Sequence, residues 1–297
     1  MRDSAYDRLP RFFGHIAPQR LATIHGYQFL DARAKTSAPI GANKDMALMS
    51  TMCNYWIRWG LIKANPFGGT RQNKADRDVR AIEHHQVLRF DLWALRQDQA
   101  YRTMGVAAMF CYLTGFRAAE VRPHDMSGLT DAGVRVIGSK RKKGEAQTVK
   151  LRHWSPRLRA VVERAKRGRK VESLFLFPNR KGLMYSKSGW ASVWQDAMYA
   201  FIGEYDAEIA KEFEVKKMRE AAQRIANRIN RPVKGGMELM LTKHADYFSL
   251  QDIRPAAITT KLENRSADAY DFAAHSNPST THRHYDRRKV KATSATE

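Results

Sequence analysis

The spacing of the apolar residues constrains the fold more than any other feature of this 297-residue sequence. Along most of the chain they recur every three or four positions, as at Met46, Met49 and Cys53, which is the spacing of one face of an α-helix. Residues 133–151 differ, because apolar and polar residues alternate on both sides of a basic turn, 140–145 (KRKKGE). This alternation indicates a β-hairpin. We therefore predict a mainly α fold with one small β-sheet, whose hairpin has a strongly basic tip.

The chain is long enough for two ordinary domains. Residues 1–70 carry helical patterns, followed near their end by the helix-breaking stretch NPFGG at 65–69. This pattern predicts an all-helical first domain. Residues 71–80 (RQNKADRDVR) are polar and basic with almost nothing to bury, and we interpret them as an interdomain linker. An ordinary surface loop has the same composition. Residues 81–297 are then a second, mainly helical domain that contains the hairpin.

The charge of the chain points to a polyanionic partner. Lys and Arg together number 52 against 30 acidic residues, which gives a formal net charge of +22. A folded protein with this excess repels itself unless a polyanion offsets the charge, and nucleic acid is the natural partner, through phosphate neutralisation and counterion release. Composition alone also allows an RNA-associated protein or a peripheral membrane protein.

Other classes of protein find little support in the sequence. No apolar run approaches the length of a membrane span and residues 1–13 do not form a signal peptide, so we expect a cytoplasmic, nucleoid-associated protein that makes no use of a membrane. Cys53 and Cys111 both sit in apolar helical patterns, and the ten His residues are scattered. Neither a disulfide framework nor zinc spacing is present, and we expect no metal and no cofactor.

Three separated segments carry the residues that metal-free attack on a DNA phosphodiester requires. They are 114–120 (TGFRAAE), 251–254 (QDIR) and 275–285 (HSNPSTTHRHY). Negative charge develops on the nonbridging oxygens in the transition state. Two arginine guanidinium groups and a further hydrogen-bond donor are suited to stabilise this charge. A nucleophile must bond covalently to the phosphate, and a general acid must protonate the leaving 5′ oxygen. Each residue alone has an ordinary structural explanation, and Glu120 is expected to form a structural ion pair with Arg117. Their combination in this order is what indicates catalysis.

These segments resemble the catalytic boxes of the tyrosine recombinase (phage integrase) family. Residues 114–120 are similar to its first box, TG-x-R-x-x-E, and residues 251–254 to its second, H-x-L-R. Residues 274–285 are similar to its last box, G-H-x-x-x-x-T-T followed by the nucleophilic tyrosine. The basic hairpin matches the family's lysine-bearing hairpin. The segment 59–66 (WGLIKANP) is similar to the end of the family's core-binding domain, so the resemblance spans residues 10–290.

The resemblance implies a fold, a reaction and a set of roles. The fold would be a helical core-binding domain followed by a mixed α+β catalytic domain. Tyr285 would attack DNA to give a 3′-phosphotyrosyl link, with neither metal nor ATP, and the working assembly would be a homotetramer on two DNA sites. The lysine of the hairpin would be the general acid, with Lys140 our choice and Lys142 a close competitor. The residues that would hold the phosphate are Arg117, Gln251, Arg254 and His275.

Three departures from the family pattern keep other functions open. Gln251 replaces the usual histidine and cannot shuttle a proton near neutral pH. The step from His275 to Tyr285 is ten positions, one more than is common, and residues 205–248 form a lengthened connection before the second box. One alternative is a type IB topoisomerase-like enzyme that relaxes DNA as a monomer. The other is a catalytically silent DNA-binding relative.

Overall fold

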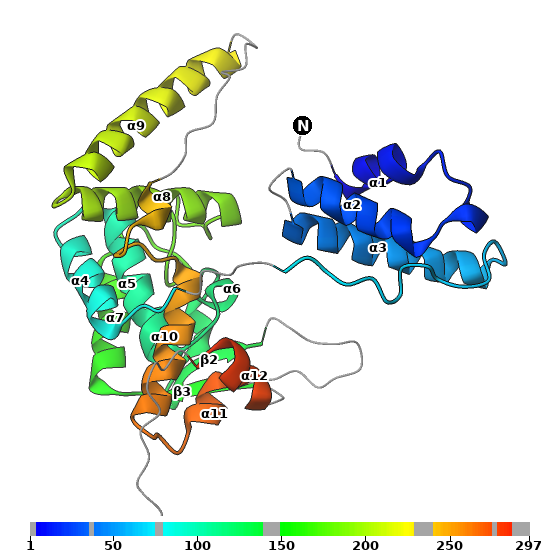
Figure 1. Cartoon of the computed structure of the whole chain (residues 1–297). Coiled ribbons are helices and arrows are strands. Elements are labelled where there is room, and N and C mark those ends of the chain that lie inside the picture. The colour runs from blue at the N-terminus through cyan, green and yellow to red at the C-terminus, as the bar shows by residue number, and fades with distance from the viewer. Residues whose placement is uncertain are drawn as a thin grey trace, which may run out of the picture. The chain divides into compact units, whose positions relative to one another are not determined.

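The computed structural model describes residues 4–35, 39–74, 80–138, 149–228, 240–274 and 278–286, and the chain divides into two compact units, 1–79 and 80–297. The fold is mainly helical with one small antiparallel sheet, as the apolar spacing predicts (Figure 1). The helices of the first unit are α1 (Ala5–Phe13), the 3₁₀ turn η1 (Pro18–Arg20), α2 (Thr23–Lys35) and α3 (Pro39–Arg58).

The first unit differs from the sequence prediction at Pro18 and Pro39. The apolar pattern predicts one helix over 17–31, but Pro18 opens a 3₁₀ turn and α2 begins only at Thr23. Residues 37–41 are predicted as a break, yet Pro39 is the first residue of α3. Both positions suit proline, whose missing N–H has no partner in the first turn of a helix. Residues 71–73 of the predicted linker bond back onto this unit, since Asn73 exchanges two hydrogen bonds with Asn43.

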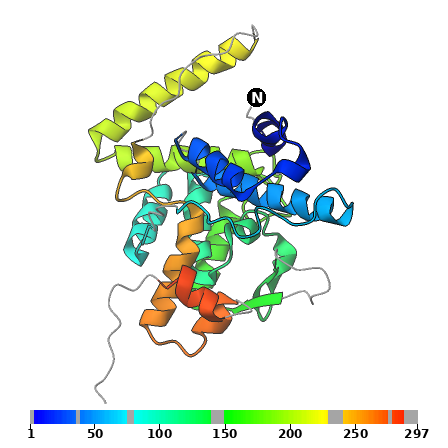
Figure 2. The same cartoon turned by 45° about the vertical axis from the view of Figure 1, so that its right-hand side comes forward.

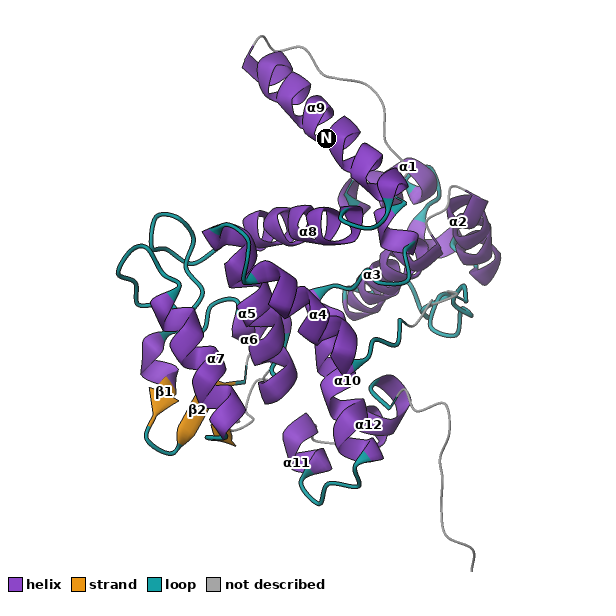
Figure 3. Ribbon diagram, turned by 90° about the vertical axis from the view of Figure 1, so that its left-hand side faces the viewer, coloured by secondary structure: helices purple, strands orange, loops and turns teal. Residues whose placement is uncertain are grey.

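The second unit is built around α5 (Gln99–Thr114), which is buried along most of its length and packs against five other helices (Figure 3). A helix that is apolar on all faces belongs in the interior of a fold. The helices in contact with α5 are α4 (His84–Ala94), α6 (Ala118–Val121), α7 (Pro156–Arg167), α8 (Lys187–Gly203) and α10 (Leu250–Glu263).

The sheet has the order β1-β2-β3 and all its neighbours are antiparallel. Val134 lies opposite Arg152 and Ile137 opposite Val149, so β2 and β3 are the two arms of the predicted hairpin. The basic tip of the hairpin lies outside the described residues. The remaining elements are β1 (Leu129–Thr130), β2 (Gly133–Ile137), β3 (Val149–His153), η2 (Met126–Gly128), α9 (Ala207–Arg228), η3 (Leu241–Lys243), α11 (Ala269–Ala273) and α12 (Pro278–His284).

Helix α11 ends at Ala274, which adopts the left-handed conformation with φ +48°. Glycine is the residue that takes this conformation without steric cost, because a Cβ atom crowds the following carbonyl. The chain thus carries an alanine where its backbone geometry suits glycine, directly before residue 275.

We predict that Ala274→Gly raises the free energy of unfolding by about 0.5–1 kcal/mol, since it removes the left-handed penalty at the cost of some chain entropy. Urea unfolding of the full chain measures the change. Ala160→Gly, at an exposed position inside α7, is the matched control and should lower the stability by about 1 kcal/mol. An equal loss in both variants would contradict the strain at Ala274.

Candidate active site

Arg117 is placed by the sharp turn that ends α5. The turn residue Gly115 has φ +61°, and a Cβ atom there would lie 2.4 Å from the ring of Phe272. Only glycine allows both this backbone and this close approach to α11. The turn brings Arg117 to the start of α6, with its side chain only partly buried.

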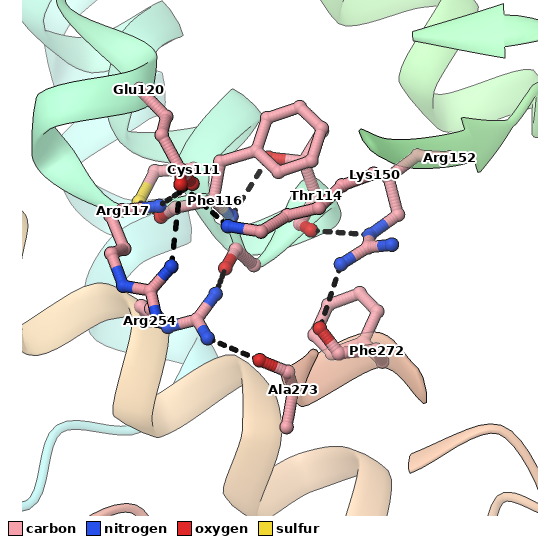
Figure 4. A network of polar contacts seen from close by, with 11 residues as sticks. Cys111, Thr114, Phe116, Arg117, Glu120, Lys150, Arg152, Arg254, Phe272 and Ala273 are labelled. Carbon is pink, nitrogen blue, oxygen red and sulfur yellow. Dashed lines mark hydrogen bonds and ion pairs between the residues drawn. The ribbon is translucent and has the colours of Figure 1, made fainter. Parts of the chain in front are cut away.

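Glu120 joins Arg117 to the sheet. Its carboxylate accepts hydrogen bonds from the Arg117 backbone N–H at 2.8 Å, from the Arg117 guanidinium at 3.3 Å and from Lys150 Nζ at 2.5 Å (Figure 4). Burial alone would raise the pKa of Glu120, but the hydrogen bonds from Lys150 and Arg117 hold the pKa below its usual range. The ion pair that the sequence predicts between Arg117 and Glu120 is therefore present and gains a second cation.

Lys150 is a buried member of the site that the sequence reasoning missed. Its side chain is 2% exposed. Burial lowers the pKa of Lys150 to about 8, against the opposing effect of Glu120. The strand β3 is inverted relative to the usual pattern, because Lys150 faces inward while Val149 and Leu151 are exposed. In the sequence, Lys150 is visible only as a lysine between two apolar residues of a strand. It turns inward because its ammonium group binds the Glu120 carboxylate.

Arg254 lies on α10 and is buried among backbone carbonyls. Its guanidinium donates to the carbonyl oxygens of Gly115 and Ala273, so one side chain ties the end of α5 to the end of α11 (Figure 4). The pKa of Arg254 lies below its usual value, because burial and the charge of Arg117 lower it. The charge of Tyr285 and a hydrogen bond to Tyr285 oppose this shift only in part. The two arginines of the predicted site thus lie close enough to repel each other.

A second, partly buried arginine, Arg152 on β3, repeats this arrangement. It donates to Thr114 O at 2.7 Å and to Phe272 O at 2.7 Å, and its guanidinium carbon lies 5.3 Å and 4.7 Å from the ring centroids of Phe116 and Phe272. Figure 4 shows Arg152 and Arg254 reaching the same two chain segments from different elements. Together Arg152 and Arg254 hold the C-terminal end of α5 next to the C-terminal end of α11.

Tyr285 lies against Arg254, although the two residues are 31 positions apart in the sequence. The Arg254 guanidinium carbon is 5.3 Å from the centroid of the Tyr285 ring. The backbone of Tyr285 is held at the end of α12, since its N–H donates to Thr281 O at 3.0 Å and its carbonyl accepts from Thr259 Oγ1 at 2.8 Å. The structure therefore brings Tyr285, Arg254 and Arg117 together.

The remaining predicted site residues are less fully placed. Gln251 is exposed on the first turn of α10, three positions before Arg254 and hence on a neighbouring part of the same helix surface. Asp252 caps this helix by accepting hydrogen bonds from the backbone N–H and hydroxyl of Ser249. Lys140, Lys142 and His275 lie outside the described residues.

Within the described ranges, no group of His, Cys, Asp and Glu side chains is arranged to hold a metal ion. None of the helices described is long and apolar enough to cross a membrane.

We predict that Lys150→Met lowers the free energy of unfolding by about 3 kcal/mol, because it leaves the buried Glu120 carboxylate with one cation fewer. Glu120→Gln in the same chain should recover more than half of this loss, since the charge that needs compensation is then absent. Urea unfolding of both single variants and the double variant measures the coupling. Lys181→Met, at an exposed position, is the control. Additive losses in the double variant would show that Lys150 and Glu120 do not stabilise each other.

Comparison with known proteins identifies the fold through structure and not through sequence. No protein-family model matches the chain, and no curated protein matches it. A crystal structure of a lambda integrase dimer bound to a COC′ core site is similar with a TM-score of 0.65 and 12% identity, over 99% of this chain and 90% of that one. A Tn1549 transposon integrase in complex with circular intermediate DNA gives a TM-score of 0.63 and 14% identity, over 96% of this chain and 88% of that one.

A lambda integrase tetramer bound to a Holliday junction is also similar, with a TM-score of 0.58 and 13% identity, over 93% of this chain and 68% of that one. All three neighbours are tyrosine recombinases. At these identities the likeness concerns the fold, and it agrees with the order of the three sequence segments and with the meeting of Arg117, Arg254 and Tyr285. The chain has the tyrosine recombinase fold.

Proposed function

We propose that this protein is a site-specific DNA recombinase that cleaves and rejoins DNA through a 3′-phosphotyrosyl intermediate at Tyr285. The observation that carries the proposal is the contact between Tyr285 and Arg254 beside Arg117. A phenol held next to two guanidinium groups is placed to attack a phosphate that those groups bind. The fold shared with integrases supports the same function.

In the proposed reaction the Tyr285 phenol releases its proton to solvent, its oxygen attacks the scissile phosphorus and forms the new P–O bond, and the bond from phosphorus to the 5′ oxygen breaks. Arg117 and Arg254 stabilise the negative charge of the nonbridging oxygens in the transition state. His275 and the neutral amide of Gln251 add hydrogen bonds to the same phosphate. Attack by a 5′ hydroxyl of a partner strand on the phosphotyrosine reverses the step and rejoins DNA, so no external energy source is consumed.

The leaving 5′ oxygen needs a proton, and we assign this role to Lys140 on the hairpin tip, with Lys142 as the competing choice. Lys150 is unsuited to the role because its ammonium is buried and bound to Glu120. It acts instead on the position of Arg117 through Glu120.

The proposed partner is double-stranded DNA. The net charge of +22 supplies the electrostatic attraction, and the similar integrase structures are complexes with DNA. We propose that residues 1–70 form a core-binding domain, that 71–80 connect it to the catalytic domain 81–297, and that the working assembly is a homotetramer on two DNA sites. The tetramer seen for lambda integrase on a Holliday junction supports this assembly.

We predict that the wild-type chain forms an SDS-resistant adduct with nicked duplexes taken from inverted repeats that flank its coding region, and that Tyr285→Phe forms none while still binding these duplexes. The phenol oxygen is the atom lost in the variant, so binding and reaction separate. Gel electrophoresis under denaturing and native conditions measures the two properties. Tyr270→Phe, on α11, is the matched control and should keep adduct formation.

The outcomes of this experiment separate the candidate functions. Identical behaviour of wild type and Tyr285→Phe would refute Tyr285 as the nucleophile. Binding without any adduct would identify a catalytically silent DNA-binding protein. Relaxation of a supercoiled plasmid by a monomer, without joining of two different DNA sites, would identify a topoisomerase-like enzyme.

We predict that Lys140→Ala lowers the cleavage rate on ordinary DNA by about 10²–10⁴-fold, the usual contribution of a general acid. A duplex with sulfur in place of the leaving 5′ oxygen should restore the rate, because a thiolate leaves without a proton. Lys142→Ala is the parallel variant. If the sulfur substrate rescues Lys142→Ala and leaves Lys140→Ala slow, the general acid is Lys142 and our choice is wrong.

A further inference from the structure

The helix α9 has an apolar stripe that the proposed site does not use. Val215, Met218 and Ile225 are all exposed, by 42%, 67% and 62% respectively, and Ala222 is exposed between them. Exposed large apolar side chains that line up along one face of a helix form a continuous apolar surface, and such a surface commonly marks a contact site. Figures 1 and 2 show α9 extending outward from α8.

The opposite face of α9 is the one that packs on the rest of its unit. The ring of Phe213 stacks on Tyr199 of α8 at 5.2 Å, and Lys216 and Lys217 both bind Asp196 of α8, at 2.5 Å and 2.7 Å. With about 100° of rotation per residue, Val215, Met218, Ala222 and Ile225 point away from α8. Among the described residues of this unit, none therefore packs over this stripe.

The spacing of the stripe is that of a coiled-coil seam. Positions 215, 218, 222 and 225 follow the steps 3-4-3, which are alternating a and d positions of a heptad repeat. In the sequence Ile229 continues the steps, although it lies outside the described residues. This is the pattern of a helix that pairs with another helix along its length and differs from the wider stripe of a helix packed on a globular core.

The charged residues beside the apolar stripe indicate which kind of helix can pair with it. Glu214 and Arg219 are exposed and stand at a g position and the following e position. In a parallel pair of identical helices, the g position of one helix meets the following e position of the other. Glu214 of each copy then faces Arg219 of the other, and the two-fold axis makes this attractive contact twice.

We infer that α9 is a self-pairing helix, which joins two copies of this chain through a short parallel coiled coil along Val215, Met218, Ala222 and Ile225. An antiparallel pair would lose the contact between Glu214 and Arg219, so the charges favour the parallel arrangement. The pairing needs no cleavage chemistry and thus stands apart from the proposed function.

The length of the seam determines how strong the contact is. Three helical turns bury much less surface than the roughly 1,200–2,000 Å² of a stable protein complex. The pair is therefore weak in dilute solution and forms when two copies are held close together, as two protomers on one DNA would be, where the effective concentration is high. Only this last statement rests on the proposed function.

Disulfide trapping tests the pairing without DNA, because an oxidised bond accumulates even from a weak encounter. Met218→Cys places a thiol at a d position, where the two copies meet, and Arg224→Cys places one at a position outside the seam that is also exposed. We expect the cross-linked dimer of Met218→Cys to form at least about tenfold faster. The wild-type chain is the background control, since Cys53 and Cys111 are buried. Equal rates for the two variants, or a thiol at 218 that maleimide cannot reach in the monomer, would overturn the proposal.

A charge swap tests the register and the direction of the pair. Introduced into the Met218→Cys chain, Glu214→Arg should slow cross-linking about fivefold, because two attractive contacts become repulsive. Adding Arg219→Glu to the same chain should restore the rate. Circular dichroism checks that these exposed substitutions keep the helix. If Arg219→Glu slows cross-linking further, the helices do not pair in the parallel register. The adduct assay on these variants is a separate measurement, so a failed pairing and a failed recombinase function are told apart.

Discussion

The structure of the second unit depends on Arg254, which connects the C-terminal ends of two helices. Its guanidinium holds the carbonyl of Gly115, at the end of α5, and the carbonyl of Ala273, at the end of α11. Burying an arginine is costly unless its N–H groups find acceptors, and here two guanidinium nitrogens donate to backbone carbonyls, which add no negative charge. The residue therefore stays cationic and fixed, and Tyr285 packs on it from outside.

This choice of acceptors leaves the site with an excess of positive charge. Arg117, Arg152, Arg254 and Lys150 lie within one network in which Glu120 is the acidic member drawn (Figure 4). Burial lowers the pKa of Arg152 and of Arg254, and a neighbouring positive charge, Arg254 for the first and Arg117 for the second, lowers each pKa further. A bound anion such as phosphate would reduce the repulsion between these neighbouring cations, so the arrangement favours anion binding.

The sequence was sufficient to predict the fold class and to single out three candidate residues that lie close together in the structure, for identifiable reasons. Arg117, Arg254 and Tyr285 stand in segments whose residue order is informative, and the alternation at 133–151 corresponds to two paired strands. What could not be predicted was the orientation of β3, because Val149 and Leu151 look like the inward residues and are exposed. Lys150 turns inward only because folding brings Glu120 to it from 30 positions away. Contacts of this kind leave no periodic trace in a sequence.

Gly115 has a consequence for how sequences of this kind are compared. A single added carbon at this position would press on the ring of Phe272 and drive α11 from α5, separating the carbonyls that Arg254 spans. A residue with no side chain to react is thus as necessary to the proposed site as the arginines that it positions. Among diverged copies, its replacement would indicate loss of the proposed activity as clearly as the loss of Tyr285, the proposed nucleophile.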